Sequence, residues 1–172
     1  PNLQPMSRTN LSPRRMLSAF ADRQFLIYCV ISWLMFLTMA QLVATLSVYV
    51  KADIGLTNAQ IGWIYSTNAF IVVLFQMLVS RAIRNFNLVK VMMVGSLLYA
   101  VGYSLMAFPE TLFQVLLLIG VITLAEMMVG PASSSLVANI APAEKYGLYM
   151  GAFGLFGTLV LAGVFLIRGI GW

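Results

Sequence analysis

Five long apolar runs constrain the fold of this chain more than any other feature of its sequence. They cover Phe25–Val50, Ile61–Val79, Leu88–Phe108, Leu112–Asn139 and Leu148–Ile167. A helix needs about 20 apolar residues to cross ~30 Å of hydrocarbon, and these runs come close to or exceed that length. With 61% hydrophobic and 9% charged residues, the chain has too little polar surface for a water-soluble globule. The sequence therefore predicts an all-α polytopic membrane protein with five spans.

The basic residues predict the orientation of these spans, because Lys and Arg accumulate in short cytoplasmic loops. Lys51 and Arg168 lie on one side of the expected bundle. The remaining basic residues lie on the other side and are Arg8, Arg14, Arg15, Arg23, Arg81, Arg84, Lys90 and Lys145. We therefore expect a multi-pass protein of the plasma (inner) membrane with its N-terminus in the cytoplasm. In the cytoplasmic loop, Arg81 and Arg84 are placed to interact with the helix end or with lipid phosphates.

The regions outside the apolar runs predict a fragment of a longer protein. Residues 1–24 are polar, contain Pro5 and Pro13, and resemble a cytoplasmic linker, whereas residues 25–172 form the expected bundle. Because both ends resemble cuts, we expect a piece of a longer polytopic protein, with a processed small protein as the alternative. No signal peptide is expected, because the first 24 residues hold no apolar segment.

Composition excludes several functions. The chain has no histidine, so neither a Ser-His nucleophile nor a His-based metal site can form within it. Cys29 is the only cysteine and lies within the first run. The basic residues are separated by spans instead of sharing one face, which argues against nucleic-acid binding. We expect neither enzymatic activity nor a bound cofactor. The lipid bilayer is the partner that the composition predicts.

Glu126 is the most informative single residue. It lies 14 residues into the fourth run, which corresponds to ~21 Å along a helix. An ionisable side chain at that depth is expensive unless it faces a cavity or a partner. Glu126 is therefore a candidate for substrate or proton handling, with a static interhelical hydrogen bond as the alternative.

The other polar residues within the runs are few and form stripes at helical spacing. The substrate or proton pathway that we expect comprises Glu126, Gln41, Asn68, Thr123, Thr38 and Gln76. Gln41 and Asn68 are expected at similar depth, with Glu126 deeper, and the stripes are expected to converge. The alternative is that Gln41 and Asn68 form ordinary hydrogen bonds between helices.

Backbone signals in the last two runs predict a hinge or a closely packed seam. Pro131 cannot donate to the carbonyl of Met127, so we expect a kink and a polar pocket beside Glu126. The alternative is an ordinary membrane-helix proline whose free carbonyl is satisfied by neighbouring helices. Small residues predict close helix packing around this region, namely Gly130, Gly147, Gly151, Gly154 and Gly157, and in the third run Gly95 and Gly102. Thr57-Asn-Ala-Gln60 is a capping-box pattern at the start of the second span.

Three segments resemble the second half of a major facilitator superfamily (MFS) transporter. They are Gly55-Leu-Thr-Asn-Ala-Gln-Ile-Gly62, Thr123-Leu-Ala-Glu126 followed by Pro131, and Ala141-Pro-Ala-Glu-Lys-Tyr-Gly147-Leu-Tyr-Met-Gly-Ala-Phe-Gly154. The resemblance is strongest to the prokaryotic multidrug-efflux branch. It implies five of the six helices of one half, helices seven to eleven of twelve, with a six-helix N-terminal half and a twelfth helix as missing partners.

The resemblance also implies a mechanism, alternating access by rocking of two halves around a central cavity. Gln41, Asn68 and Glu126 would face that cavity. The loop Ser80–Asn87 departs from the family pattern, because its acid and both of its glycines are absent. We therefore expect a secondary transporter that exports hydrophobic or cationic small molecules in exchange for protons. The alternative is a five-helix membrane interaction protein, or a truncated half that acts only with a partner.

Overall fold

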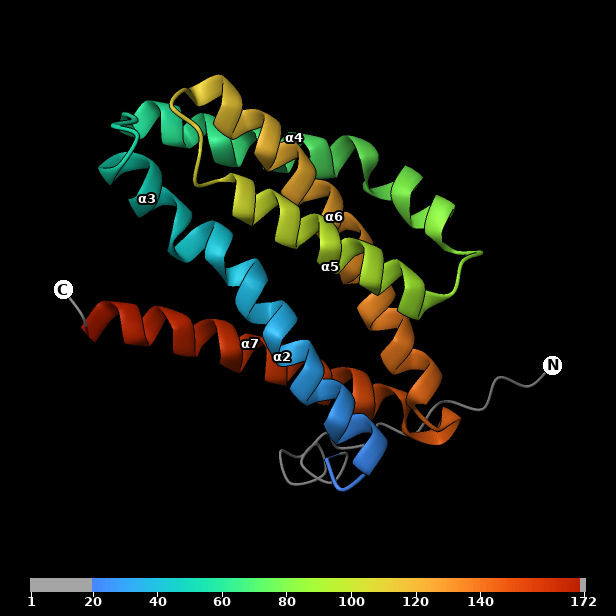
Figure 1. Ribbon diagram of the computed structural model, residues 1–172. Helices are drawn as coiled ribbons and strands as arrows, with labels where there is room; N and C mark the ends of the chain where they lie inside the picture. The colour runs from blue at the N-terminus through green and yellow to red at the C-terminus, as the bar shows by residue number, and fades with distance from the viewer. Residues whose placement is uncertain (1–19, 171–172) are drawn as a thin grey trace.

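The computed structural model describes residues 20–170, and this part of the chain is helical (Figure 1). Its elements are α2 (Arg23–Ala44), α3 (Leu46–Ala52), α4 (Asn58–Ile83), α5 (Leu88–Leu105), α6 (Leu112–Ile140), the short 3-10 helix η1 (Ala143–Lys145) and α7 (Tyr146–Ile170). Five helical segments among them, with α2 and α3 taken together, are long and apolar enough to span a membrane. The all-α fold with five spans is thus confirmed, whereas most of the expected linker lies outside the described residues.

Polar side chains begin these helices where the sequence leaves the apolar runs. Thr57 and Gln60 form the expected capping box, with the Gln60 amide donating to Thr57 Oγ1 and the Thr57 amide to Gln60 Oε1. Thr111 and Gln114 repeat this arrangement at the start of α6. Such caps satisfy amides that the first helical turn leaves unpaired, so they fix where each span enters the bundle.

The first span differs from the expected single helix, because Thr45 interrupts it. At Thr45 the backbone has φ −108° and ψ −40°, and α3 begins at the next residue. The hydroxyl of Tyr65 on α4 donates to the carbonyl of Leu42 at 3.3 Å. In an uninterrupted helix the amide of Leu46 would occupy that carbonyl. A side chain of α4 therefore satisfies the backbone at the break.

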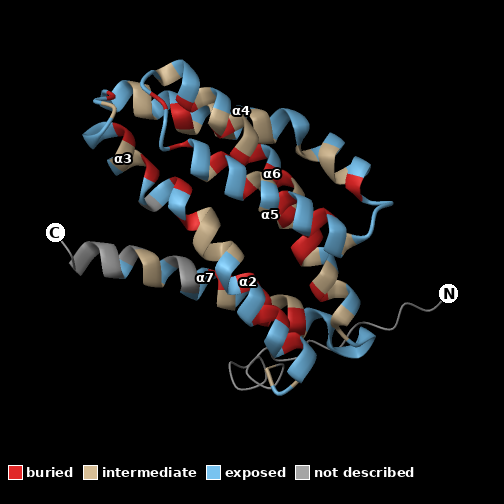
Figure 2. Ribbon diagram, in the orientation of Figure 1, coloured by how far each residue is buried: buried red, intermediate tan, exposed pale blue. Residues whose placement is uncertain are grey.

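Helix α6 is the centre of the packing. It packs mainly against α5 and α4, while α2 packs mainly against α7, and these two groups meet along α6 (Figure 1). Residues of α6 belong to both hydrophobic cores: Val137 to the one that contains Phe25 and Tyr149, and Ile122 to the one that contains Leu42. Figure 2 shows buried positions along the faces that α6 and its neighbours share. Side chains of α6 are thus held from several directions.

Glycines allow the closest helix contact at the α5–α6 seam. A Cβ atom at Gly95 would lie 2.5 Å from Cγ2 of Val129, and one at Gly102 would lie 2.6 Å from Cγ1 of Ile122. The packing expected at Gly95 and Gly102 is therefore present. A Cβ at Gly157 would lie 2.9 Å from the ring of Phe36 on α2.

The glycines expected to pack on the fifth span behave differently. A Cβ at Gly147 or Gly154 would meet no described atom within 4 Å, and the same holds for Gly130 on α6. Close approach of α7 to α2 is made instead at Gly157, at the end of the glycine series. The expected packing at Gly147 and Gly154 is thus not made within the described residues, and both positions are exposed.

The outer face of α4 is strongly apolar. Phe70, Val73 and Met77 are 65%, 81% and 65% exposed, and exposed positions dominate this helix (Figure 2). Monomeric soluble proteins rarely expose such continuous apolar surface. Hydrocarbon or another membrane segment must cover this face, which agrees with a membrane-spanning bundle.

Candidate functional site

Asn68 connects Glu126 to the neighbouring helix. Nδ2 of Asn68, on α4, lies 3.0 Å from Oε2 of Glu126 and 2.9 Å from Oγ1 of Thr123, both on α6. The two N–H groups of one amide therefore bind two side chains that are one helical turn apart. Three residues from the expected pathway thus form one constellation.

The direction of these hydrogen bonds follows from Thr123. Its side chain is fully buried, and its hydroxyl donates to the carbonyl of Ile119 at 2.7 Å. Because that hydroxyl has one proton, Thr123 can only accept from Asn68. The amide nitrogen of Asn68 must then face α6, and the half-buried Glu126 receives a donor that carries no charge.

The relative depth expected for these residues is wrong in one respect. Counting along the sequence placed Glu126 deeper than Asn68, yet their side chains are in direct contact. Counting residues within each run takes no account of how α4 and α6 are offset against each other.

Two tyrosines of α5 lie near this carboxylate, and the sequence interpretation did not include them. The rings of Tyr99 and Tyr103 stack with centroids 6.0 Å apart. Both hydroxyls are buried and have no hydrogen-bond partner among the described residues. Both lie close enough to Glu126 to interact electrostatically with its carboxylate when that group is ionised. Their spacing of four residues on an apolar helix was the signal that could have indicated a polar face there.

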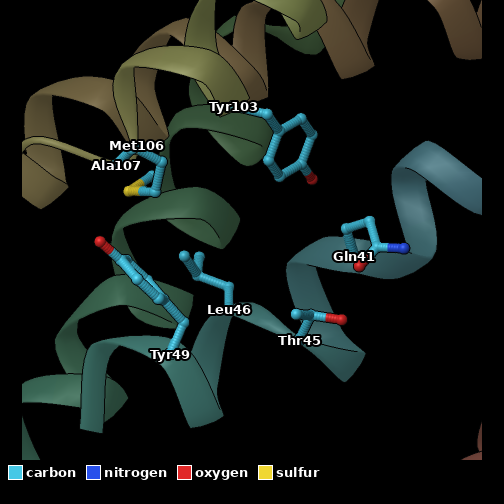
Figure 3. A pocket seen from close by; sticks show the side chains of 7 residues that line it. All are labelled: Gln41, Thr45, Leu46, Tyr49, Tyr103, Met106 and Ala107. Carbon is cyan, nitrogen blue, oxygen red and sulfur yellow. The ribbon is translucent and has the colours of Figure 1, made fainter. Parts of the chain in front are cut away.

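Gln41 lies at a separate pocket of about 300 Å³ and has no described contact with Asn68. Figure 3 shows this pocket, with Gln41 on one side and Tyr103 of α5 on another. Its lining residues are Gln41, Thr45, Leu46, Tyr49, Tyr103, Met106 and Ala107. Thr38 donates to the carbonyl of Leu34 and lines a second pocket, of about 250 Å³, in which Tyr103 also takes part. The polar residues Thr38 and Gln41 of α2 therefore share pockets with Tyr103 and not with Asn68.

The side-chain amide of Gln76 donates to the backbone carbonyl of Met127, which Pro131 leaves without its helical donor. Helix α6 continues through Pro131 as one α-helix. Nε2 of Gln76 lies 3.3 Å from the carbonyl oxygen of Met127 and 3.0 Å from Oγ of Ser80. Of the two expectations for this carbonyl, the contact agrees with the one in which a neighbouring helix supplies the donor and not with a polar pocket, because a side chain of α4 fills the hydrogen-bonding position.

At the other end of the bundle, two tyrosines link α2 to α6 and α7. The hydroxyl of Tyr28 lies 2.8 Å from Oγ of Ser133 and donates to the Ser133 carbonyl at 3.0 Å. The hydroxyl of Tyr149 donates to Oδ2 of Asp22 at 2.8 Å, and this bond, with the capping amides of α2, holds the pKa of Asp22 below its usual 3.8. Arg81 and Arg84 are exposed at the end of α4.

Five apolar helices that enclose an acid, an amide and tyrosine hydroxyls define a polytopic membrane protein with a polar interior. The model of the Major Facilitator Superfamily matches residues 25–171. The chain therefore belongs to this family, whose members are membrane transporters and not enzymes.

Two relatives illustrate the match. An uncharacterized MFS-type transporter of Bacillus subtilis, YttB, is 27% identical over 124 residues, which are 71% of this chain and 30% of the relative. The multidrug resistance protein MdtH of Aeromonas hydrophila is 32% identical over 112 residues, which are 64% of this chain and 28% of that protein. The chain thus spans less than a third of the length of either relative. No solved structure matches the chain significantly.

Proposed function

We propose that this chain is the C-terminal part of a secondary transporter that exports hydrophobic or cationic small molecules in exchange for protons. The observation that carries the proposal is the position of Glu126, which lies within a membrane-spanning helix and is bound by the neutral amide of Asn68. A carboxylate paired with Arg or Lys would be fixed in its ionised form. A carboxylate paired with an amide can be neutralised by either a proton or a cation, which is the exchange that an antiporter needs.

A pocket separate from Glu126 favours organic substrates. The pocket at Gln41 and Tyr103 combines aromatic and aliphatic walls with four side chains that carry polar groups, those of Gln41, Thr45, Tyr49 and Tyr103. Sites for small organic molecules have this composition, mostly apolar with a few polar groups that orient the ligand. The name of the Aeromonas relative, a multidrug resistance protein, agrees with this substrate class.

The position of the chain in the whole transporter is part of the same proposal. We place its spans as helices seven to eleven of twelve, with the N-terminus in the cytoplasm, and we expect a six-helix N-terminal half and a twelfth helix as its partners. Support comes from the basic residues on the expected cytoplasmic side and from the short share of each relative that the chain covers. An antibody against residues 1–24 should detect, in native membranes, a band of more than twice 18.9 kDa. A band near 19 kDa would favour a five-helix interaction protein.

Replacement of Glu126 by Gln tests the exchange directly. The variant keeps the shape of the side chain and its contact with Asn68 but cannot bind and release a proton. Ethidium efflux from vesicles that carry the native protein should lose its dependence on the proton gradient. Glu110→Gln is the matched control, because Glu110 is exposed and precedes α6. Proton-dependent efflux that survives Glu126→Gln would refute the proposed role.

A further inference from the structure

The side chain of Gln76 supplies a hydrogen bond that α6 lacks. Pro131 has no amide N–H, so it cannot bind the carbonyl of Met127, four residues earlier. Nε2 of Gln76 lies 3.3 Å from that carbonyl oxygen. Because a carbonyl only accepts, the amide nitrogen must face it. The second N–H of Gln76 binds Oγ of Ser80 at 3.0 Å, so both donors of the amide are used.

This bond acts on the turn that carries the acid. Met127 directly follows Glu126, and its side chain is 2% exposed. Within the hydrocarbon core an unpaired carbonyl is strongly unfavourable, so a helix relaxes until such a group finds a donor. Loss of the Gln76 amide would therefore favour bending of α6 at Pro131, and the bend would move Glu126 relative to α4.

Gln76 and Asn68 hold α6 from the same helix. They are eight residues apart on α4, about 2.2 turns, so they share one broad face of the helix. Gln76 binds the backbone of Met127, while Asn68 binds the side chains of Thr123 and Glu126. The bond from Gln76 holds the turn of α6 that contains Met127 in place. The bond from Asn68 holds the carboxylate of Glu126, which belongs to the same turn.

We propose that Gln76 is a positioning residue for Glu126, replacing the backbone hydrogen bond lost at Pro131 and so keeping the carboxylate against the amide of Asn68. The sequence interpretation assigned Gln76 to the substrate path. The contacts assign it instead to the backbone of α6. The importance of this position for transport rests on the proposed function, whereas the hydrogen-bond replacement does not.

The test measures how much of Glu126 is protonated in the native protein that carries this chain. Dicyclohexylcarbodiimide reacts with protonated carboxyl groups in apolar surroundings, and mass spectrometry of peptides locates the adduct. Glu126→Gln gives the background signal, because it has no carboxyl group at position 126 to label. In Gln76→Leu the bond from Asn68, which stabilises the ionised carboxylate, should be lost. Labelling of Glu126 near neutral pH should then rise on the order of threefold to tenfold. The other titratable groups that face this carboxylate, Tyr99 and Tyr103 of α5, are unchanged in every variant.

Pro131→Ala provides the decisive comparison, because an alanine amide can bind the Met127 carbonyl itself. In that background Gln76→Leu should change the labelling less than about twofold. Ser80→Ala is the matched control, since it removes the other partner of Gln76 and leaves the bond to Met127 in place. An equal effect of Gln76→Leu in both backgrounds, or no effect beside Pro131, would overturn the proposal. If Gln76→Leu does not fold, Gln76→Asn, whose shorter side chain cannot span the distance, takes its place in the same cycle.

The labelling experiment needs no substrate and no transport. If the cycle behaves as expected while Glu126→Gln leaves proton-dependent efflux intact, the positioning role stands and the proposed function fails. If Glu126→Gln abolishes that efflux while the cycle shows no coupling between Gln76 and Pro131, the proposed function stands and the positioning role fails.

Discussion

The side-chain amide of Asn68 donates a hydrogen bond to the carboxylate of Glu126, and the same amide donates to Thr123. In Asn68→Leu the carboxylate loses that donor, and we expect proton-dependent ethidium efflux to fall about tenfold, as for a hydrogen bond to a charged group. Asn85→Leu, at an exposed loop position, should leave efflux unchanged. Initial efflux rates at equal protein levels measure both effects, and wild-type efflux in Asn68→Leu would show that the contact is only structural.

A second prediction at this scale concerns acid stability. The bond from Tyr149 contributes most to the lowered pKa of Asp22. A lowered pKa in the folded state stabilises the fold above the usual pKa of 3.8, and this stabilisation is lost as the pH falls through the lowered value. Tyr149→Phe should therefore lower the melting temperature at neutral pH, and the difference from wild type should vanish well below pH 3.8.

The control for that measurement lies one turn earlier on the same helix. Tyr146 is 49% exposed, so Tyr146→Phe should follow the wild-type melting temperature across the whole pH range. A deficit of Tyr149→Phe that is as large in acid as at neutral pH would mean that the lost contact is packing and not the bond to Asp22.

At the residue scale, the sequence predicts only part of the site. Asn68, Thr123 and Glu126 stand out because polar residues are rare within the apolar runs, and the structure brings these three together. The roles of Gln76 and Tyr65 were out of reach, because each binds a backbone carbonyl on another helix. Every residue has a backbone carbonyl, so the sequence does not indicate which one accepts such a bond. Only the tertiary structure shows which side chain reaches it.

At the scale of elements, the seam between α5 and α6 depends on the absence of a side chain at Gly95. Gly95→Ala would place a methyl group 2.5 Å from Cγ2 of Val129. We expect this clash to destabilise the bundle by about 1–3 kcal/mol, the usual effect of overpacking. Thermal unfolding in detergent, followed by circular dichroism, measures the change.

Val129→Ala removes the opposing methyl group and should restore part of the stability lost in Gly95→Ala. Gly147→Ala is the control, because a Cβ there meets no described atom within 4 Å, and alanine is the better helix former by up to about 1 kcal/mol. Equal destabilisation by Gly95→Ala and Gly147→Ala would contradict a specific seam. A specific seam would also be contradicted if Val129→Ala restored none of the stability lost in Gly95→Ala.

The elements themselves were largely predictable. Apolar length located all five spans, and Thr57 with Gln60 fixed the start of α4. The break at Thr45 was not predictable, because hydropathy averages over many residues and one residue in a different backbone conformation does not change it. The glycine series predicted packing at Gly157, but its spacing could not tell which of its glycines meets a ring such as that of Phe36.

At the scale of the whole molecule, the proposed orientation predicts which loops face the cytoplasm. Cys29 is buried within the bundle, so it should give little background in labelling with a membrane-impermeant maleimide. Asn85→Cys, in the loop after α4, should react only from the cytoplasmic side. Asn58→Cys, at the start of α4, should react only from the outside. The reverse pattern would contradict the assignment made from the basic residues.

In the proposed mechanism one carboxylate, Glu126, exchanges protons for substrate. The most direct measurement follows protons and not the drug, in proteoliposomes that contain the native protein and a pH-sensitive dye in the lumen. An imposed ethidium gradient should drive proton movement with the wild-type protein and none with Glu126→Gln. Undiminished ethidium-driven proton movement in Glu126→Gln would show that Glu126 does not carry the exchanged proton.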